Sequence, residues 1–416
     1  MSNSRWTNLL VAYIALVGAF LPYVGWSPSL STISEELNLN YSQAGGISSI
    51  TGLVAGVMIL IGGVVASRWG AKNVIACGLA AGVVGQAAFA MADGFELILV
   101  ARVLAGISVG FLWVATYTMA VNWFRDSNRT GRALGVMLSG DGMGAVLSLF
   151  VFSAVLAAFG WRMGLVVQAV LMSVVLLAVL FLSKNAPAVP GNDPLHSVPA
   201  DPVLGVSPGP TFRSVMNRNV LSALLVWIGG VGLFSVIASW MPAILVEDGG
   251  MSESLAGFLT ALFSIAGSAA ALSVPIIAER LGAKKKLIIV AGFVTTGSLL
   301  AMTTFLAVGN YVLVAAFVPL IGIGVYAAES LTLAEAIESV LPRLAGVVNG
   351  ITLGIPWIVS GFAYPYLLGA VKDSTGSFVQ GFVVLIVATT VLCAVSPFFI
   401  REGARAVEPT TSALKV

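Results

Sequence analysis

The stretch Gly63–Lys72 reads GVVASRWGAK, and 212 positions later the stretch Pro275–Lys284 reads PIIAERLGAK. Arginine, glycine, alanine and lysine recur in register between the two copies. Each copy joins two apolar runs, so each predicts a short polar loop between two helices. A loop that recurs in both halves of a chain predicts two parallel structural repeats packed around a site at the middle of a membrane.

The composition indicates that most of this fold faces lipid. Of the 416 residues, 58% are hydrophobic and only 9% are charged, whereas about a quarter of the residues in a soluble domain are charged. A transmembrane helix needs roughly 20 apolar residues. We therefore predict an all-α membrane protein with twelve transmembrane helices in two pseudo-symmetric six-helix bundles.

Apolar runs with breaks between them predict the individual spans. These cover 7–28, 44–66, 73–92, 95–120, 131–157, 162–183, 218–245, 254–278, 286–307, 310–333, 346–370 and 378–400. The segment 184–217 between the two groups of six contains seven prolines and is typical of a flexible cytoplasmic linker. We expect one bundle over 1–183 and a second bundle with a short cytoplasmic tail over 218–416.

The loop charges predict the orientation in the membrane. With both termini inside, the inner loops carry ten lysines and arginines and the outer loops carry only Arg162 and Lys372. Positive residues resist translocation, so both termini are predicted to be cytoplasmic in a multi-pass cell-membrane protein. The inner ten are Arg68, Lys72, Arg125, Arg129, Arg132, Arg280, Lys284, Lys285, Lys286 and Arg343.

Several classes of function are disfavoured by what the chain contains. The net charge of +2 offers no basic patch for nucleic acid. Cys77 and Cys393 lie in apolar runs and the single His196 lies in the linker, so no disulfide framework, metal site or cofactor is expected. The chain shows no constellation for catalysis and no ATP-binding loop. A transporter driven by an ion or solute gradient fits better than an enzyme.

The repeated loop resembles the motif G-x-x-x-D-R-x-G-R/K-R/K of the major facilitator superfamily, and the resemblance covers essentially the whole chain. In the first copy Ser67 replaces the acid and Ala71 replaces one base. In the second copy Glu279 restores an acid and Pro275 replaces the first glycine. The remaining residues that match are Gly63, Arg68, Gly70 and Lys72, then Arg280, Gly282 and Lys284. The resemblance implies alternating access by a functional monomer, in which these loops gate the outward-facing state.

Arg102, Gly106 and Gly110 resemble the family's R-x-x-x-G pattern in helix four. The resemblance implies a part in proton coupling for the arginine. The structural alternative is a buried arginine bound to carbonyl groups or to a neighbouring helix. Both interpretations stay open at this stage.

Two carboxylates are predicted deep in the membrane. Asp141 lies in the sequence SGDGMG of the fifth span, and Glu329 follows Tyr326 in the inner half of the tenth. A bare charge at that depth costs at least about 2.5 kcal/mol, so these groups are the best candidates to bind protons or substrate. The alternatives are a structural hydrogen bond for Asp141 and an interfacial position for Glu329.

Aromatic residues accompany these carboxylates. The resemblance implies that helices one, four, seven and ten line the central path, which makes Trp113, Tyr117, Trp227 and Tyr326 candidate substrate contacts. The repeat offset pairs Tyr117 with Glu329. The Gly-Pro motif that drug antiporters of the family carry in helix five is missing, which weighs against multidrug efflux.

The resulting hypothesis is a proton-coupled secondary transporter, such as a symporter, for a small organic solute. A monocarboxylate would be bound by Arg102. The alternative is efflux of lipophilic or cationic compounds, which would use the carboxylates and aromatic residues. A membrane sensor that has lost transport is the alternative from another class.

Overall fold

The computed structural model describes residues 2–124, 130–186, 215–341 and 344–401. It contains twelve helices long and apolar enough to cross a membrane, and the described residues form no strand. The predicted fold class is therefore confirmed. The greater part of the predicted linker, 187–214 with His196, lies outside the described residues, as do Arg125, Arg129 and Arg343.

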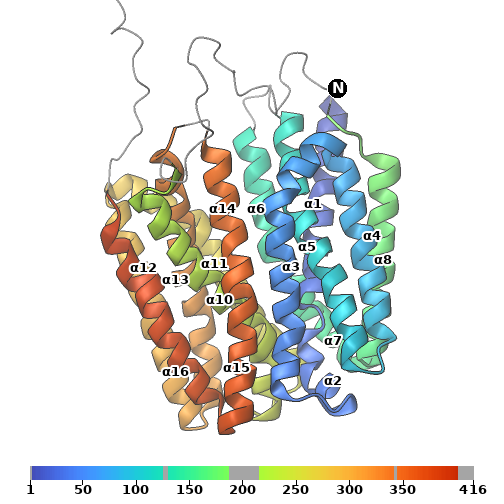
Figure 1. The fold of residues 1–416 in the computed structure, drawn as a ribbon, viewed down its shortest axis with the longest axis vertical. Helices are drawn as coiled ribbons and strands as arrows, with labels where there is room; N and C mark the ends of the chain where they lie inside the picture. Colours follow the sequence, from blue (N-terminus) through green and yellow to red (C-terminus); the bar gives the residue numbers. More distant parts are fainter. Residues whose placement is uncertain (1, 125–129, 187–214, 342–343, 402–416) are drawn as a thin grey trace, which may run out of the picture.

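The first six spans form the N-terminal bundle, on the right in Figure 1. They are α1 (Ser2–Val24) continued by η1 (Ser27–Ser29) and α2 (Leu30–Glu36); α3 (Tyr41–Trp69); α4 (Ala71–Ala90); α5 (Phe95–Phe124); α6 (Thr130–Val146) continued by η2 (Leu147–Val151) and α7 (Phe152–Phe159); and α8 (Trp161–Leu182).

The other six spans form the C-terminal bundle, on the left in Figure 1. They are α10 (Arg218–Glu247); α11 (Glu253–Leu281); α12 (Lys284–Ala307); α13 (Tyr311–Glu338); α14 (Ala345–Pro356) continued by η4 (Trp357–Gly361) and α15 (Phe362–Thr375); and α16 (Phe378–Thr389) continued by η5 (Thr390–Val395) and η6 (Ser396–Phe399).

The first span differs most from its predicted range. It runs to Glu36 rather than ending at residue 28, because a turn of 3₁₀ helix with Pro28 in its first turn connects α1 to α2. Proline is tolerated there, since the first turn of a helix leaves its N–H groups unpaired within the helix. The chain then turns at Asn40, which forms a capping box with Gln43 at the start of α3.

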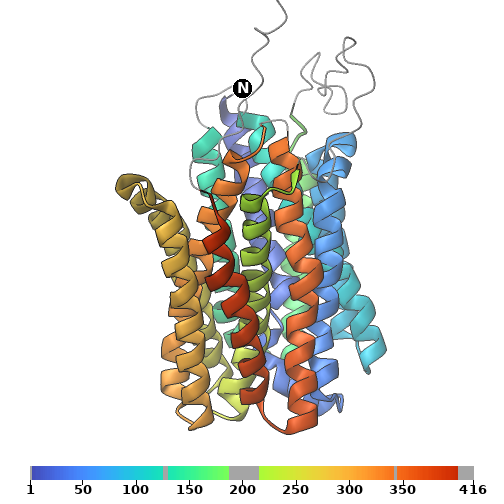
Figure 2. The same ribbon diagram turned by 60° about the vertical axis from the view of Figure 1, so that its left-hand side comes forward.

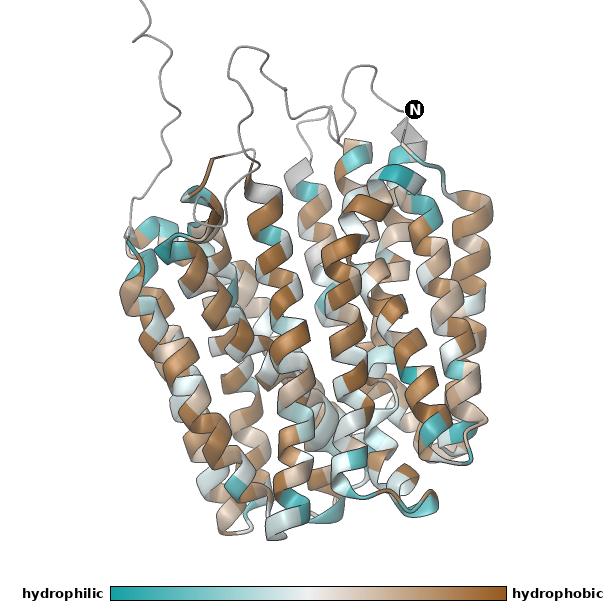
Figure 3. Cartoon of the chain, in the orientation of Figure 1, coloured by the Kyte–Doolittle hydropathy of each residue, from teal (hydrophilic) through white to brown (hydrophobic). Residues whose placement is uncertain are grey.

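We call the end of the molecule where α1 begins the near end (top of Figure 1), and the opposite end the far end. Figure 3 shows hydrophobic residues along the length of the helices and hydrophilic residues concentrated at the two ends. Figure 2 shows the hairpin of α11 and α12, in gold, standing away from the neighbouring helices at the near end.

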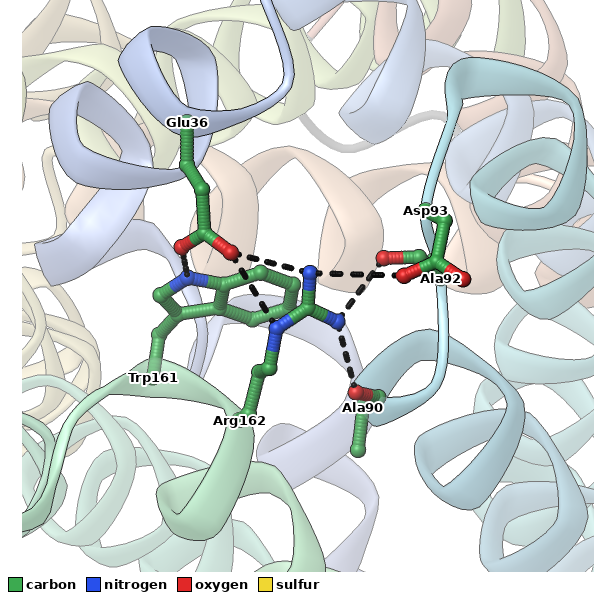
Figure 4. Close-up of polar contacts among 6 residues, drawn as sticks. All are labelled: Glu36, Ala90, Ala92, Asp93, Trp161 and Arg162. Atoms are coloured by element: carbon green, nitrogen blue, oxygen red, sulfur yellow. Dashed lines mark hydrogen bonds and ion pairs between the residues drawn. The ribbon is translucent and has the colours of Figure 1, made fainter.

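An arginine ties three spans together at the far end of the N-terminal bundle (Figure 4). Arg162, in the first turn of α8, donates to Glu36 Oε1 at 2.9 Å and to the carbonyl oxygens of Ala90 and Ala92 at 3.0 and 2.8 Å. Trp161 Nε1 donates to the other oxygen of Glu36 at 2.6 Å. A cation at the C-terminus of α4 also interacts favourably with that helix dipole, so this corner is built to be rigid.

The two bundles are related by the same offset as the sequence repeat. The hydroxyl groups of Tyr23 in α1 and Ser235 in α10 lie 3.0 Å apart, and these residues are separated by 212 positions. Two pseudo-equivalent residues can touch only close to the axis that relates the repeats. The pseudo-twofold axis therefore passes near Tyr23 and Ser235.

Candidate functional site

The bundles meet along a seam of glycines between α3 and the span formed by α14, η4 and α15. A Cβ atom on Gly52 would lie 2.7 Å from the carbonyl oxygen of Gly361, and one on Gly56 would lie 2.7 Å from the backbone nitrogen of Ile358. A Cβ atom on Gly45 would lie closer still to the carbonyl oxygen of Pro365. Small residues let helix backbones approach at this distance, so the seam holds the bundles in direct backbone contact from the far end past mid-depth.

A second contact joins α11 to the span of α6, η2 and α7. The backbone at Gly257 lies directly against the carbonyl of Leu149, leaving no room for a side chain. Phe150 and Phe258 meet beside it with ring centroids 5.0 Å apart. This contact also lies at the far end, because α11 begins there.

Hydrogen bonds between the bundles are grouped in the far half among the described residues. Asp373 accepts from the backbone nitrogens of Tyr41 and Ser42 at 3.0 and 2.7 Å, and from the Ser42 hydroxyl. Glu253 accepts from Ser29 and Thr32 at 3.3 and 3.1 Å. Further bonds join Ser48 to Ser239 at 2.6 Å and Ser27 to the carbonyl of Ala238 at 2.7 Å. The far end is closed in this structure.

Aromatic side chains from both bundles form a layer at mid-depth, on the near side of this closure. The ring of Trp357 in η4 lies 5.0 Å from that of Tyr23 and 5.5 Å from that of Trp113. Phe20 packs on Trp113 at 5.8 Å, and Phe234 packs on Tyr23 at 5.7 Å. These five residues are called the aromatic floor below.

Asp141 lies on the near side of the aromatic floor, between the bundles. Its Oδ2 atom accepts a hydrogen bond from the Tyr117 hydroxyl at 3.3 Å, and its Oδ1 atom is buried without a partner among the described residues. The next residue, Gly142, packs directly on Ser268 of α11. The glycines of the SGDGMG sequence thus bring this carboxyl group to the C-terminal bundle.

Glu329 approaches the same region from α13. Its carboxyl group lies against Gly230 of α10, where any side chain would collide with it. The indole nitrogen of Trp227 donates to the Glu329 backbone carbonyl at 3.1 Å. Tyr326, one turn away, interacts electrostatically with both Glu329 and Asp141. Asp141, Glu329, Tyr117, Tyr326 and Trp113 are each half-buried. The structure brings Tyr117 to Asp141 and Trp227 to Glu329, and Tyr326 lies within electrostatic range of both carboxyl groups.

Arg102 lies apart from this group. It is fully buried in the far half of α5, where it donates to the carbonyl oxygen of Pro22 at 2.6 Å and to Gln86 Oε1 at 3.1 Å. Its guanidinium stacks over Phe89, 4.6 Å from the ring centroid. Gln86 in turn bonds to Gln168, which donates to the carbonyl of Gly25 at 2.9 Å. The bonds of Arg102 within the described residues are thus made to its own bundle.

A family model described as Major Facilitator Superfamily matches residues 12–364, most of the chain. The chain belongs to this superfamily.

Three relatives whose names state a transported solute share 22–24% of their residues with this chain. It is 24% identical to the hexuronate transporter of Bacillus subtilis over 64% of this chain and 62% of that transporter. It is 23% identical to the 4-hydroxybenzoate transporter PcaK of Pseudomonas putida over 90% and 87% of the respective chains. It is also 22% identical to the nitrite extrusion protein of Bacillus subtilis over 92% of each chain.

Solved structures show the same fold. A bacterial homologue of the human lysosomal transporter Spinster, in an inward-facing and unoccupied conformation, superposes with a TM-score of 0.72 at 15% identity. The match covers 96% of this chain and 97% of that one. The occupied inward-facing form superposes with a TM-score of 0.70 at 13% identity, covering 98% and 99% of the two chains.

The residues of the two repeated loops lie at the near end of the protein. Arg68, Glu279 and Arg280 are exposed, as is Gly63. Gly70 and Gly282 have positive φ, of 84° and 58°. Lys72 donates to the Leu180 carbonyl, and Lys284 contacts Glu335 and Glu338 at 3.3 and 3.0 Å. These contacts stay within one bundle, so the predicted gating of the other state remains a prediction.

The sequence prediction missed Trp357 and Asp373. Trp357 lies in an apolar span where nothing in the sequence indicates which face meets the other bundle, and Asp373 reads as an ordinary loop charge. A signal for the seam was present, since Gly45, Gly52 and Gly56 recur at intervals of seven and four along α3. That spacing places them on one face of a helix.

Proposed function

We propose that this protein moves a small organic solute across the membrane by alternating access. The supporting observation is the half-buried group around Asp141 and Tyr326, which comes from both bundles and lies on the near side of the aromatic floor. A solute bound there could reach the far side only if the seam and the far-end hydrogen bonds opened. Closure at one end is the condition that alternating access requires.

We propose that the near end is cytoplasmic. Arg68, Lys72, Arg280 and Lys284–Lys286 gather at this end, and positively charged loops are retained in the cytoplasm. The described conformation is then inward-facing, like that of the structural relatives. The division of the chain at 184–217 and a cell-membrane location are part of the same proposal.

We propose that Asp141, Glu329 or both couple transport to protons. Neither carboxyl group pairs with a lysine or arginine among the described residues, and a bare charge is costly at this depth. A group of this kind binds a proton when the site is dry and releases it when the site is opened to water. The solute gradient and the proton gradient are thereby linked.

Two variants in proteoliposomes test the coupling. Asp141→Asn and Glu329→Gln retain the shape of the side chain and remove its titration. Replacement of a coupling residue should abolish solute accumulation driven by a pH gradient, whereas exchange of solute across the membrane should remain intact. Accumulation with wild-type pH dependence in both single variants would remove these carboxylates from the coupling mechanism.

Two kinds of solute are candidates: an anion, and a cationic or lipophilic compound. The names of the relatives specify hexuronate, 4-hydroxybenzoate and nitrite, which favours an anion such as a monocarboxylate. The carboxylates and aromatic residues of the site favour a cationic or lipophilic compound. The position of Arg102 bears on this choice.

A further inference from the structure

We infer that the solute carries a positive charge: the geometry points to a small organic cation with an apolar, preferably aromatic, body, bound by Asp141 on the near side of the aromatic floor. This inference rests on the proposed transport function. It departs from the anions named for the relatives.

The interior charges of the molecule are the first observation. Among the described residues, each lysine and arginine except Arg102 lies in a loop or in the first or last turn of a helix. By the same criterion, Asp141 and Glu329 are the two acidic residues that lie in the helix interiors. The part of the membrane interior that the structure describes therefore holds two carboxylates and one guanidinium.

The guanidinium of Arg102 is the second observation, because it is already bound. It is buried in the N-terminal bundle between the Pro22 carbonyl, Gln86 and the ring of Phe89. Moving it to the site would leave those acceptors unpaired in a dry environment, which is strongly unfavourable. An anion at the site would face Asp141 with no cationic side chain of the described residues beside it.

The third observation is the unused acceptor on Asp141. Tyr117 satisfies Oδ2, whereas Oδ1 is buried without a partner among the described residues. A buried acceptor without a donor is costly, and a carboxylate binds an ammonium group through charge-assisted hydrogen bonds. An ammonium ligand would therefore supply the hydrogen-bond donor and the positive charge that Asp141 Oδ1 lacks in the site.

The aromatic floor supplies the other half of the recognition. Trp113, partly exposed, packs against Trp357 and Phe20 close to the level of Asp141. Aromatic side chains bury an apolar ligand body and attract cations to their ring faces. Protons and cations would compete for the one carboxylate of Asp141. Such competition drives exchange of the solute against protons rather than symport.

The experiment measures binding to the purified full-length protein in nanodiscs, using three ligands that share a phenyl ring and a similar size but differ in charge: benzylammonium, benzyl alcohol and benzoate. We expect benzylammonium to bind at least tenfold more tightly than the other two and to raise the Tm of the protein. Its affinity should fall as the pH is lowered, and its binding should release protons into a weakly buffered solution.

Variants identify the carboxylate. Asp141→Asn should weaken benzylammonium binding at least tenfold, Asp141→Glu should restore most of it, and Glu96→Gln, at an exposed acid in the first turn of α5, should leave it unchanged. If Asp141→Asn does not fold, the pH dependence and proton release of the wild-type protein carry the test. Both must be present for the inference to stand.

Three results would overturn the inference: benzoate binding as tightly as benzylammonium, benzylammonium binding that fails to respond to pH or to the loss of Asp141 in a folded variant, or no binding of any of the three ligands. Counterflow in proteoliposomes separates this inference from the proposed function. Uptake of benzoate without benzylammonium would overturn the charge assignment alone. Tight benzylammonium binding without movement of any solute would overturn transport alone.

Discussion

Removal of the Asp373 carboxylate should shift the protein toward a conformation open at the far end. The carboxylate accepts three hydrogen bonds from the first two residues of α3 in the opposite bundle. It therefore acts as an N-cap supplied across the interface, and loss of an N-cap costs about 0.5–2 kcal/mol. Because three bonds are lost in Asp373→Ala, we expect about 1–2 kcal/mol, a shift of roughly 5–30-fold in the closed-to-open ratio.

The assay is a distance measurement between spin labels on cysteines at Met91 and Val308, the exposed C-caps of α4 and α12 at the far end. The exposed Cys77 is first replaced by alanine. Asp373→Ala should increase the population with the longer distance, and Asp373→Asn should have a smaller effect because one amide oxygen remains to accept.

Ser374→Ala is the matched control, since the Ser374 hydroxyl donates to the Val371 carbonyl in its own helix and, among the described residues, to no group of the other bundle. It should leave the distance distribution unchanged. An unchanged distribution in Asp373→Ala, or an equal shift in Ser374→Ala, would refute the reasoning that this carboxylate holds the bundles closed.

Two further predictions concern the glycine contacts and the orientation. Gly257→Ala should open the far end in the same distance assay with little change in Tm, because Gly257 contacts the other bundle at Leu149; Gly322→Ala, which meets the Phe263 backbone inside its own bundle, should instead lower Tm without opening it. Equal Tm losses in both variants would contradict this distinction. Reporter fusions at Lys184 and Gly250 should be active on the cytoplasmic and the external side respectively, and a cytoplasmic Gly250 reporter would reverse the proposed orientation.

The fold could be predicted from the sequence because each span must be apolar over the full thickness of the bilayer. That requirement locates α8 or α10 to within two residues, but it does not define where a helix continues beyond the lipid. The first span illustrates the limit, since α2 carries Ser31, Ser34, Glu35 and Glu36 and extends the helix past its apolar run.

The sequence predicts which residues belong to the site better than it predicts the contacts that these residues make. Asp141 and Glu329 stand out because charged residues are rare at membrane depth. The bonds of Arg102 could not be inferred, since Pro22 and Gln86 approach it only through the way that α1 and α4 pack on α5. The pairing of Trp357 with Tyr23 likewise depends on how the two bundles meet.

The five residues Trp357–Gly361 form a π-helical turn inside the span that meets α3. Such a turn accommodates one more residue than an α-helix, and one residue corresponds to about 100° of rotation around a helix axis. The length of this segment, as well as its composition, therefore determines that Pro365 and Asp373 face α3. Deletion of a single residue in this turn would rotate Pro365 and Asp373 away from α3, although every other residue of the chain would be unchanged. Comparison of relatives at this seam should accordingly follow insertions and deletions as closely as substitutions.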